Sequence, residues 1–191
     1  MIGLLQCRES RLHRFSLLVL VVANMHATAA MADSECETFS TESLAPAPTE
    51  AVDRETLNQL IAWIALNTMY DVSLTYRSPP TITFCEIGEH VPYEKTELLV
   101  DEMLGAVYDQ QRRTIHLVQP WSSHDLHDLS TLLHELIHDV QLENREWSCT
   151  GEPELEAYWL QNKWLVERGE RLDIPWSAIL ELSTCPEGDA E

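Results

Sequence analysis

The amino-acid sequence predicts an α+β fold in which a long helix packs on a small, mainly antiparallel sheet and further helices follow toward the C-terminus. Segments with alternating apolar residues, typical of strands, occupy parts of residues 81–118. Apolar residues at helical spacing then dominate residues 125–142 and residues 153–168. With 191 residues, the chain is long enough for one domain with a substantial core but short for two.

The first fifty residues predict an export signal and a linker. Three arginines precede a short apolar run, FSLLVLVVANM, and the small residues at Ala27–Ala30 suit a cleavage site. We therefore expect a signal peptide over residues 1–30 and a mature protein that is secreted or resides in a bacterial periplasm. The apolar run is shorter than the roughly 20 residues that span a bilayer. We thus expect no stable membrane insertion after cleavage, with an uncleaved anchor as the alternative. Residues 31–50 are acidic and rich in proline and alanine, which favours a polar linker.

The folded domain is expected over residues 51–185, followed by a short acidic tail over residues 186–191. Its first helix is expected at about Asp53–Tyr70, because apolar residues recur there at helical spacing and Asp53 can cap the helix start. The prolines of RSPP at Arg77–Pro80 then interrupt regular structure.

Strands are expected in the middle of the domain. The β-branched residues of TITFCEI at Thr81–Ile87 predict one strand. Residues 88–104 are ambiguous, and the segment TELLVDEML within them favours a short helix. Gly105–Val118 predicts a hairpin, because two apolar runs flank a polar turn at Gln110–Arg112.

Three helices complete the predicted domain. The longest is expected at about Asp125–Leu142, and the next at about Pro153–Arg168, with proline at its first turn. A short helix is expected at Trp176–Leu182, and it should return antiparallel toward the start of the previous helix.

The cysteines predict two disulfides in the mature chain. Cys7 would leave with the signal peptide, and four cysteines remain in a compartment that is expected to be oxidising. Because the last helix should return toward the start of the previous one, we expect Cys149 to pair with Cys185, which leaves Cys36 with Cys85. The other pairings and metal binding by cysteine are the less favoured alternatives, since the chain has no CxxC pair.

The charge balance restricts the partners. The chain has 12 basic and 32 acidic residues and a net charge of −20. Such an acidic surface argues against nucleic acid and anionic membranes as partners. Most of these carboxylates are expected to lie on solvated faces.

The stretch LLHELIHDVQ carries the candidate chemistry. His134 and His138 lie one helical turn apart, so that both imidazoles can reach one metal ion. Glu135 can lean toward the same opening and take a proton from a water molecule that the metal activates. The pattern is short and can arise by chance, but both histidines border the apolar stripe of their helix, which favours ligands over surface residues. A pair of hydrogen-bonded core histidines is the alternative.

A catalytic zinc site needs a third protein ligand and an open fourth position. Glu154 shares a helical face with mostly apolar residues, where an unpaired carboxylate would be costly. We therefore predict Glu154 as the third ligand. Glu156, on the opposite and charged face, is the reserve candidate.

HELIH and the later ELEAY together resemble the gluzincin branch of the zincin metallopeptidases, whose ligands are two motif histidines and a glutamate on the following helix. A wider pattern resembles a family of small secreted bacterial HExxH proteins of unknown function. That resemblance covers about Thr56–Cys185 and includes, besides the HExxH motif, Trp121, Asp128, Ser130, Cys149, Glu154, Ala157, Tyr158, Gln161, Trp164 and Leu165. The chain departs from larger gluzincins at Tyr158, where those often carry an acid that holds a ligand histidine.

The resemblance implies a zincin-like metallohydrolase domain with one Zn²⁺ ion on His134, His138 and Glu154. In that reading Glu135 is the general base that deprotonates the water and later protonates the leaving amine.

A further donor should stabilise the oxyanion. Tyr158 is the favoured candidate and the second predicted catalytic residue, with His127 and Tyr108 as the others. The segment TIHLV at Thr114–Val118 resembles the edge strand on which zincins bind extended peptides, with ordinary core packing as the alternative.

The leading hypothesis is therefore a secreted zinc-dependent metallopeptidase that acts on a peptide or protein substrate. The alternative is a non-catalytic, zinc-stabilised binding domain of the same fold, but zinc binding alone does not require Glu135. A metal-free interaction domain is the third possibility. The sequence leaves the cleavage specificity and the oligomeric state open.

Overall fold

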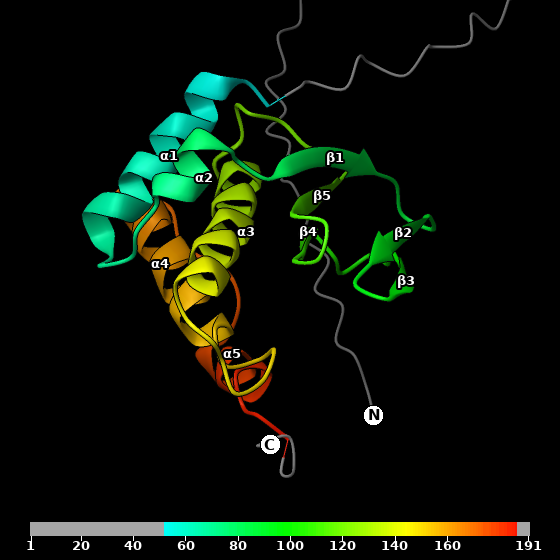
Figure 1. Ribbon diagram of the computed structural model, residues 1–191. Coiled ribbons are helices and arrows are strands. Elements are labelled where there is room, and N and C mark those ends of the chain that lie inside the picture. Colours follow the sequence, from blue (N-terminus) through cyan, green and yellow to red (C-terminus); the bar gives the residue numbers. More distant parts are fainter. Residues whose placement is uncertain (1–51, 187–191) are drawn as a thin grey trace, which may run out of the picture. The chain divides into compact units, whose positions relative to one another are not determined.

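The computed structural model describes residues 52–186, and these residues adopt an α+β fold (Figure 1). They belong to one compact unit. The predicted signal peptide, the predicted linker and all but the first residue of the predicted acidic tail lie outside the described residues. None of the helices between residues 52 and 186 has the length and apolar character that a membrane span requires.

A three-stranded mixed sheet has the strand order β1-β5-β4. Strands β4 (Ala106–Asp109) and β5 (Thr114–Val118) form the predicted antiparallel hairpin, and β1 (Thr81–Cys85) pairs in parallel with β5. The expectation that Thr114–Val118 is an edge strand is wrong, because β5 lies in the centre and β4 lies at the edge. Four consecutive residues of β5, from Ile115 to Val118, are buried, which is typical of a strand covered on both faces.

A second, two-stranded sheet lies within residues 88–104, which the sequence left ambiguous with a short helix as one option at TELLVDEML. Strands β2 (His90–Tyr93) and β3 (Thr96–Leu99) pair antiparallel, with Tyr93 opposite Thr96. Apolar residues at the base of this hairpin form a small separate cluster, whose buried members are Cys85, Val91, Val100 and Val118. Burial of these side chains outweighs the weak helical pattern of the segment.

Two helices begin after an aspartate that caps them, as the sequence predicted for Asp53. Helix α1 (Arg54–Asn67) begins after Asp53, whose carboxylate accepts a hydrogen bond from the Thr56 amide at 2.7 Å. Helix α3 (Leu126–Asn144) begins after Asp125, which caps it in the same way. A short helix, α2 (Ser73–Arg77), was not predicted.

Helix α3 lies between the sheet and the other helices and forms the centre of the core (Figure 1). Its fully buried apolar residues are Leu132, Leu133, Leu136, Ile137 and Val140. They pack against core residues of α1, β4, β5 and α4. Helix α4 (Glu154–Val166) runs beside α3, so the side chains of these two helices can meet along their length.

The predicted disulfide between Cys149 and Cys185 is confirmed. It joins the loop before α4 to the end of α5 (Trp176–Leu182). The two segments touch so closely that a Cβ atom at Gly151 would collide with the carbonyl oxygen of Leu182. Cys85, in contrast to its predicted pairing with Cys36, is a free buried thiol, and Cys36 lies outside the described residues.

A buried charge holds α3 against its neighbours. The fully buried carboxylate of Asp139 accepts hydrogen bonds from Arg113 at 2.9 and 3.0 Å, from the Tyr108 hydroxyl at 2.7 Å and from the Thr75 hydroxyl at 2.7 Å. A buried carboxylate is tolerated when its lone pairs are satisfied in this way. The network fixes α3 relative to α2, β4 and the β4–β5 turn. Asp139, at its centre, follows His138 directly in the sequence.

Candidate metal centre

Two histidines project from the same side of α3. His134 and His138 are both buried, and their Nε2 atoms lie 3.0 Å apart. Residues four apart on a helix lie above one another, so this spacing brings the two rings to one point. The same two nitrogens face the start of α4.

Glu154, in the first turn of α4, completes the cluster. One carboxylate oxygen lies 3.3 Å from Nε2 of His134, and the other lies 3.3 Å from Nε2 of His138. One donor atom from each of the three residues can be chosen so that all lie within 4.8 Å of one another, a grouping that could hold a metal ion. The structure thus brings together the three ligands that the sequence predicted.

Glu156, the reserve candidate, has other partners. Its carboxylate accepts hydrogen bonds from the Tyr70 hydroxyl at 2.6 Å and from the amide nitrogen of Gln141 at 3.0 Å. It is not a member of the three-residue cluster among residues 52–186.

The carboxylate of Glu154 dominates the electrostatics of the cluster. Burial alone would raise the pKa of Glu154, but hydrogen bonds and charge interactions with His134 and His138 hold it well below its usual value. Burial disfavours the charged form of His138, yet the interaction with Glu154 outweighs it and raises the pKa of this imidazole. Glu154 is therefore ionised and faces the two nitrogens that a cation would use.

Each histidine ring is held from behind by a glutamine amide. Nδ1 of His134 lies 3.0 Å from the amide oxygen of Gln161, and Nδ1 of His138 lies 3.0 Å from the amide oxygen of Gln141. The sequence pattern included Gln161 without a role, and neither glutamine was predicted to support a ligand. Gln161 lies seven residues after Glu154, two helical turns along the same face, and this spacing was visible in the sequence.

The orientation of both amides follows from their other partners. The amide nitrogen of Gln141 donates to the carbonyl oxygen of Pro153 and to the Glu156 carboxylate, which can only accept. The amide nitrogen of Gln161 donates to the Ser130 hydroxyl, whose own proton is donated to the carbonyl oxygen of His127.

Both amide oxygens therefore face the histidines. An oxygen acceptor requires a proton on each Nδ1, so that in the neutral rings Nε2 is left without a proton and is free to bind a cation. Two neutral imidazole nitrogens and one carboxylate form a donor set that suits a divalent transition metal.

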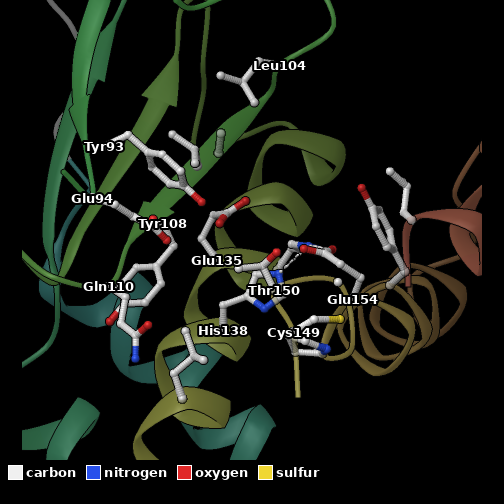
Figure 2. Close-up of a pocket in the computed structure, with 18 residues that line it drawn as sticks. Tyr93, Glu94, Leu104, Tyr108, Gln110, Glu135, His138, Cys149, Thr150 and Glu154 are labelled. Atoms are coloured by element: carbon white, nitrogen blue, oxygen red, sulfur yellow. Dashed lines mark hydrogen bonds and ion pairs between the residues drawn. The ribbon is translucent and has the colours of Figure 1, made fainter. Parts of the chain in front are cut away.

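Glu135 lies between the cluster and the sheet. Its side chain is buried, and Figure 2 shows it at the centre of the pocket, between Tyr93 on one side and Glu154 on the other. Burial is the main reason that the pKa of Glu135 is raised, and the nearby charge of Glu154 adds to it, while the two histidines act in the opposite direction. Glu135 is not a member of the three-residue cluster, so its carboxylate can act beside the cation site rather than within it.

The cluster opens into a pocket of about 420 Å³. Edge strand β4 contributes one wall with Ala106, Val107 and Tyr108, and the tip of the β2–β3 hairpin contributes Tyr93 and Glu94. The opposite wall is formed by the loop before α4 and the end of α5, where the Cys149–Cys185 disulfide joins the two segments. The remaining lining residues of the pocket are Leu104, Gln110, His134, Glu135, His138, Leu142, Cys149, Thr150, Gly151, Pro153, Glu154, Tyr158 and Leu182.

Of the three candidate oxyanion donors, Tyr158 remains the favoured one. Its ring centroid lies 4.4 Å from that of His134, and the residue lines the pocket. Tyr108 also lines the pocket, but its hydroxyl donates to Asp139 at 2.7 Å and is engaged in the buried network. The side chain of His127 is 52% exposed, faces Glu170 and does not line the pocket.

Tyr93 is a pocket residue that the sequence did not reveal. Figure 2 shows its hydroxyl directed toward Glu135, and partial burial together with nearby carboxylates raises its pKa. Its position depends on the β2–β3 hairpin, which was not apparent from the sequence. No local signal around Tyr93 indicates a functional residue.

The glutamine supports predict the effect of a single substitution. Gln161→Leu keeps the volume of the side chain but removes the acceptor for Nδ1 of His134, so the ring loses its fixed tautomer and orientation. We expect zinc affinity, measured by competition with a chromophoric chelator, to fall by about tenfold to a hundredfold. Gln59→Leu, at an exposed position of α1, is the matched control and should leave the affinity unchanged. Equal affinities of the Gln161 variant and the unmodified protein would mean that the amide does not support the ligand.

A family model described as a domain of unknown function (DUF6647) matches residues 49–191. No curated protein and no solved structure matches the chain.

Proposed function

We propose that this chain, which belongs to the DUF6647 family, is a secreted zinc-dependent metallopeptidase. The observation that carries the proposal is the position of Glu135, a buried carboxylate that lies beside the cluster of His134, His138 and Glu154 and faces the same pocket. A cluster that serves only to stabilise the fold has no need of a fourth, non-ligating acid at its open side.

The donor set supports zinc as the metal. Catalytic zinc sites commonly combine two histidines and one glutamate with an open position for water or substrate. In the neutral rings both Nε2 atoms carry no proton and could bind a metal, because Gln141 and Gln161 hold the protons on the opposite nitrogens. When bound, zinc would polarise a carbonyl group and lower the pKa of a water molecule.

The remaining steps belong to the side chains of the chain itself. Glu135 takes a proton from the attacking water and returns it to the leaving amine, as general acid–base catalysis requires. Tyr158, beside His134, donates a hydrogen bond to the developing oxyanion. The Asp139 network and the two glutamines keep these groups in place before substrate arrives.

Edge strand β4 supports a peptide as substrate. It pairs with β5 on one side only, and three of its four residues line the pocket. An extended peptide can add to such an edge through main-chain hydrogen bonds, which brings one of its peptide bonds to a fixed place. This role replaces the one expected for Thr114–Val118, which lies in the centre of the sheet.

The disulfide supports a location outside the cytoplasm. Disulfides persist in oxidising compartments and are rare in the cytosol, and Cys149–Cys185 joins two segments of the pocket wall. The basic and apolar pattern of residues 1–30 points in the same direction.

The proposal is tested by digestion of a peptide library with the purified mature protein. We expect about one zinc ion per chain, cleavage of a subset of peptides, loss of cleavage with a chelator and recovery when zinc is added back. A protein that holds zinc but cleaves no peptide would instead favour the non-catalytic binding domain. A protein that holds no transition metal would contradict both.

A further inference from the structure

The pocket has one charged group that the proposed chemistry does not use. Its charged lining residues, apart from the two histidines, are three carboxylates, and no lysine or arginine lines it. Glu154 and Glu135 are accounted for by the metal cluster and by proton transfer. Glu94 remains, and we propose that it selects a substrate with a lysine or arginine side chain next to the bond that is cleaved. This inference rests on the proposed function of the site.

The backbone at Glu94 is held in place at the rim. Glu94 is the first of the two residues that connect β2 to β3, and its φ of +51° is unusual for a residue other than glycine. Nη1 of Arg112 donates to the carbonyl oxygen of Glu94 at 2.9 Å, which ties the hairpin tip to the β4–β5 turn. Figure 2 shows Glu94 and Tyr93 on the side of the pocket opposite Glu154.

The nearby cations do not neutralise the Glu94 carboxylate. Arg112 makes an ion pair with the fully buried carboxylate of Asp109 at 2.6 Å. Lys95 is exposed and does not line the pocket. Within residues 52–186, no ion pair of Glu94 is found. The carboxylate therefore keeps an uncompensated charge at a half-buried position, where a cation from a ligand would be favoured.

The pocket also fits the apolar part of a long basic side chain. Three leucines line it in addition to the carboxylates, namely Leu104, Leu142 and Leu182. Lysine and arginine place their methylene groups against apolar surface while the charged end reaches a polar partner. An acidic substrate side chain would meet only like charges at Glu94 and Glu135, and an apolar one would leave Glu94 without a partner.

The preference is tested by binding as well as by cleavage. The probes are the hydroxamates of arginine, norleucine and glutamate, which attach to zinc whether or not the protein is a peptidase. With zinc-loaded mature protein, we expect the arginine hydroxamate to bind about twofold to fivefold more tightly than the norleucine hydroxamate, the range of a partly exposed ion pair. The glutamate hydroxamate should bind most weakly. The second readout is the rate of cleavage of peptides that differ only in the residue on either side of the cleaved bond.

Variants at the hairpin assign the preference to Glu94. Glu94→Gln should remove the advantage of arginine over norleucine, and Glu94→Asp should keep part of it. Glu97→Gln, on the exposed part of β3, is the matched control and should bind all three probes as the unmodified protein does. Thermal unfolding of each variant shows that the fold is intact.

The outcomes separate this inference from the proposed function. Equal affinities for arginine and norleucine hydroxamates, or an arginine preference that Glu94→Gln leaves intact, would overturn the role of Glu94. A Glu94-dependent preference in a protein that cleaves no peptide would support the role of Glu94 and contradict the peptidase. If no hydroxamate binds, both the zinc site and the selection by Glu94 are wrong.

Discussion

Glu135→Gln is expected to leave one zinc ion bound per chain and to lower kcat on any cleaved peptide by roughly a hundredfold to ten-thousandfold, the range for loss of a general base. Glutamine has the size of glutamate but cannot accept the proton of the attacking water. Glu135 does not belong to the cluster of His134, His138 and Glu154, so its replacement removes no ligand. Zinc content by elemental analysis and kcat on the best library peptide measure the two effects separately.

Glu143→Gln is the matched control for this substitution. Glu143 lies on the same helix two turns later and is 36% exposed, and among residues 52–186 it makes a single long surface ion pair, of 3.7 Å with Arg113. Its replacement should change neither zinc content nor kcat. If Glu135→Gln loses zinc, Glu135 is a ligand and the assigned roles are wrong. If it retains full activity, another group is the base.

Glu154→Ala is expected to weaken zinc binding by more than about a hundredfold, which exceeds the loss expected for a residue that only supports a ligand. The substitution leaves two imidazoles and no anionic ligand, so the site loses both a donor atom and the charge that favours a cation. Competition with a chromophoric chelator gives the zinc affinity. Hydrolysis should fall in parallel, because metal no longer occupies the site at working concentrations.

Glu156→Ala provides the comparison for Glu154. It lies two residues away on α4 and removes the partners of Tyr70 and Gln141 without touching the cluster. We expect a smaller loss of zinc affinity, about tenfold or less, since its effect on His138 passes through Gln141. If Glu156→Ala weakens zinc binding more than Glu154→Ala does, Glu156 and not Glu154 is the third ligand.

The sequence predicted four of the five described helices and the candidate metal cluster, because these features depend on local spacing. The caps Asp53 and Asp125 stand at the starts of their helices, and the apolar stripe of α3 alone indicates a buried helix. His134 and His138 lie one turn apart in any helix. The prediction of Glu154 as a ligand rests on the free-energy cost of an unpaired carboxylate on an apolar face. That cost applies however α4 packs.

The features that the sequence did not predict depend on contacts between distant segments. The hairpin that carries Tyr93 is stabilised by the burial of Val91 and Val100 against Cys85 and Val118, which no local pattern shows. The central position of β5 depends on its parallel pairing with β1. Strand β4 and the β2–β3 hairpin separate these two strands in the sequence, so no local pattern indicates the pairing.

The roles of Gln141 and Gln161 behind the two histidines could not be predicted for the same reason. Gln161 has the right spacing from Glu154, but its role requires that α4 packs beside α3 with Ser130 opposite. The amide of Gln141 is oriented by Pro153 and Glu156, which lie beyond a loop. Residue type and spacing indicated a site, whereas the tautomer of each histidine could be derived only from the packed structure.

The choice of amides rather than acids behind the two imidazoles affects how the centre responds to acidification. A carboxamide neither gains nor loses a proton over the range in which proteins stay folded, so the support for each ring is the same in mildly acidic and mildly alkaline surroundings. Release of a bound ion at low pH should then follow protonation of the groups that bind it, because the two amides themselves do not titrate. If the protein is secreted, as proposed, such supports would let a metal site keep its shape while the surrounding acidity changes.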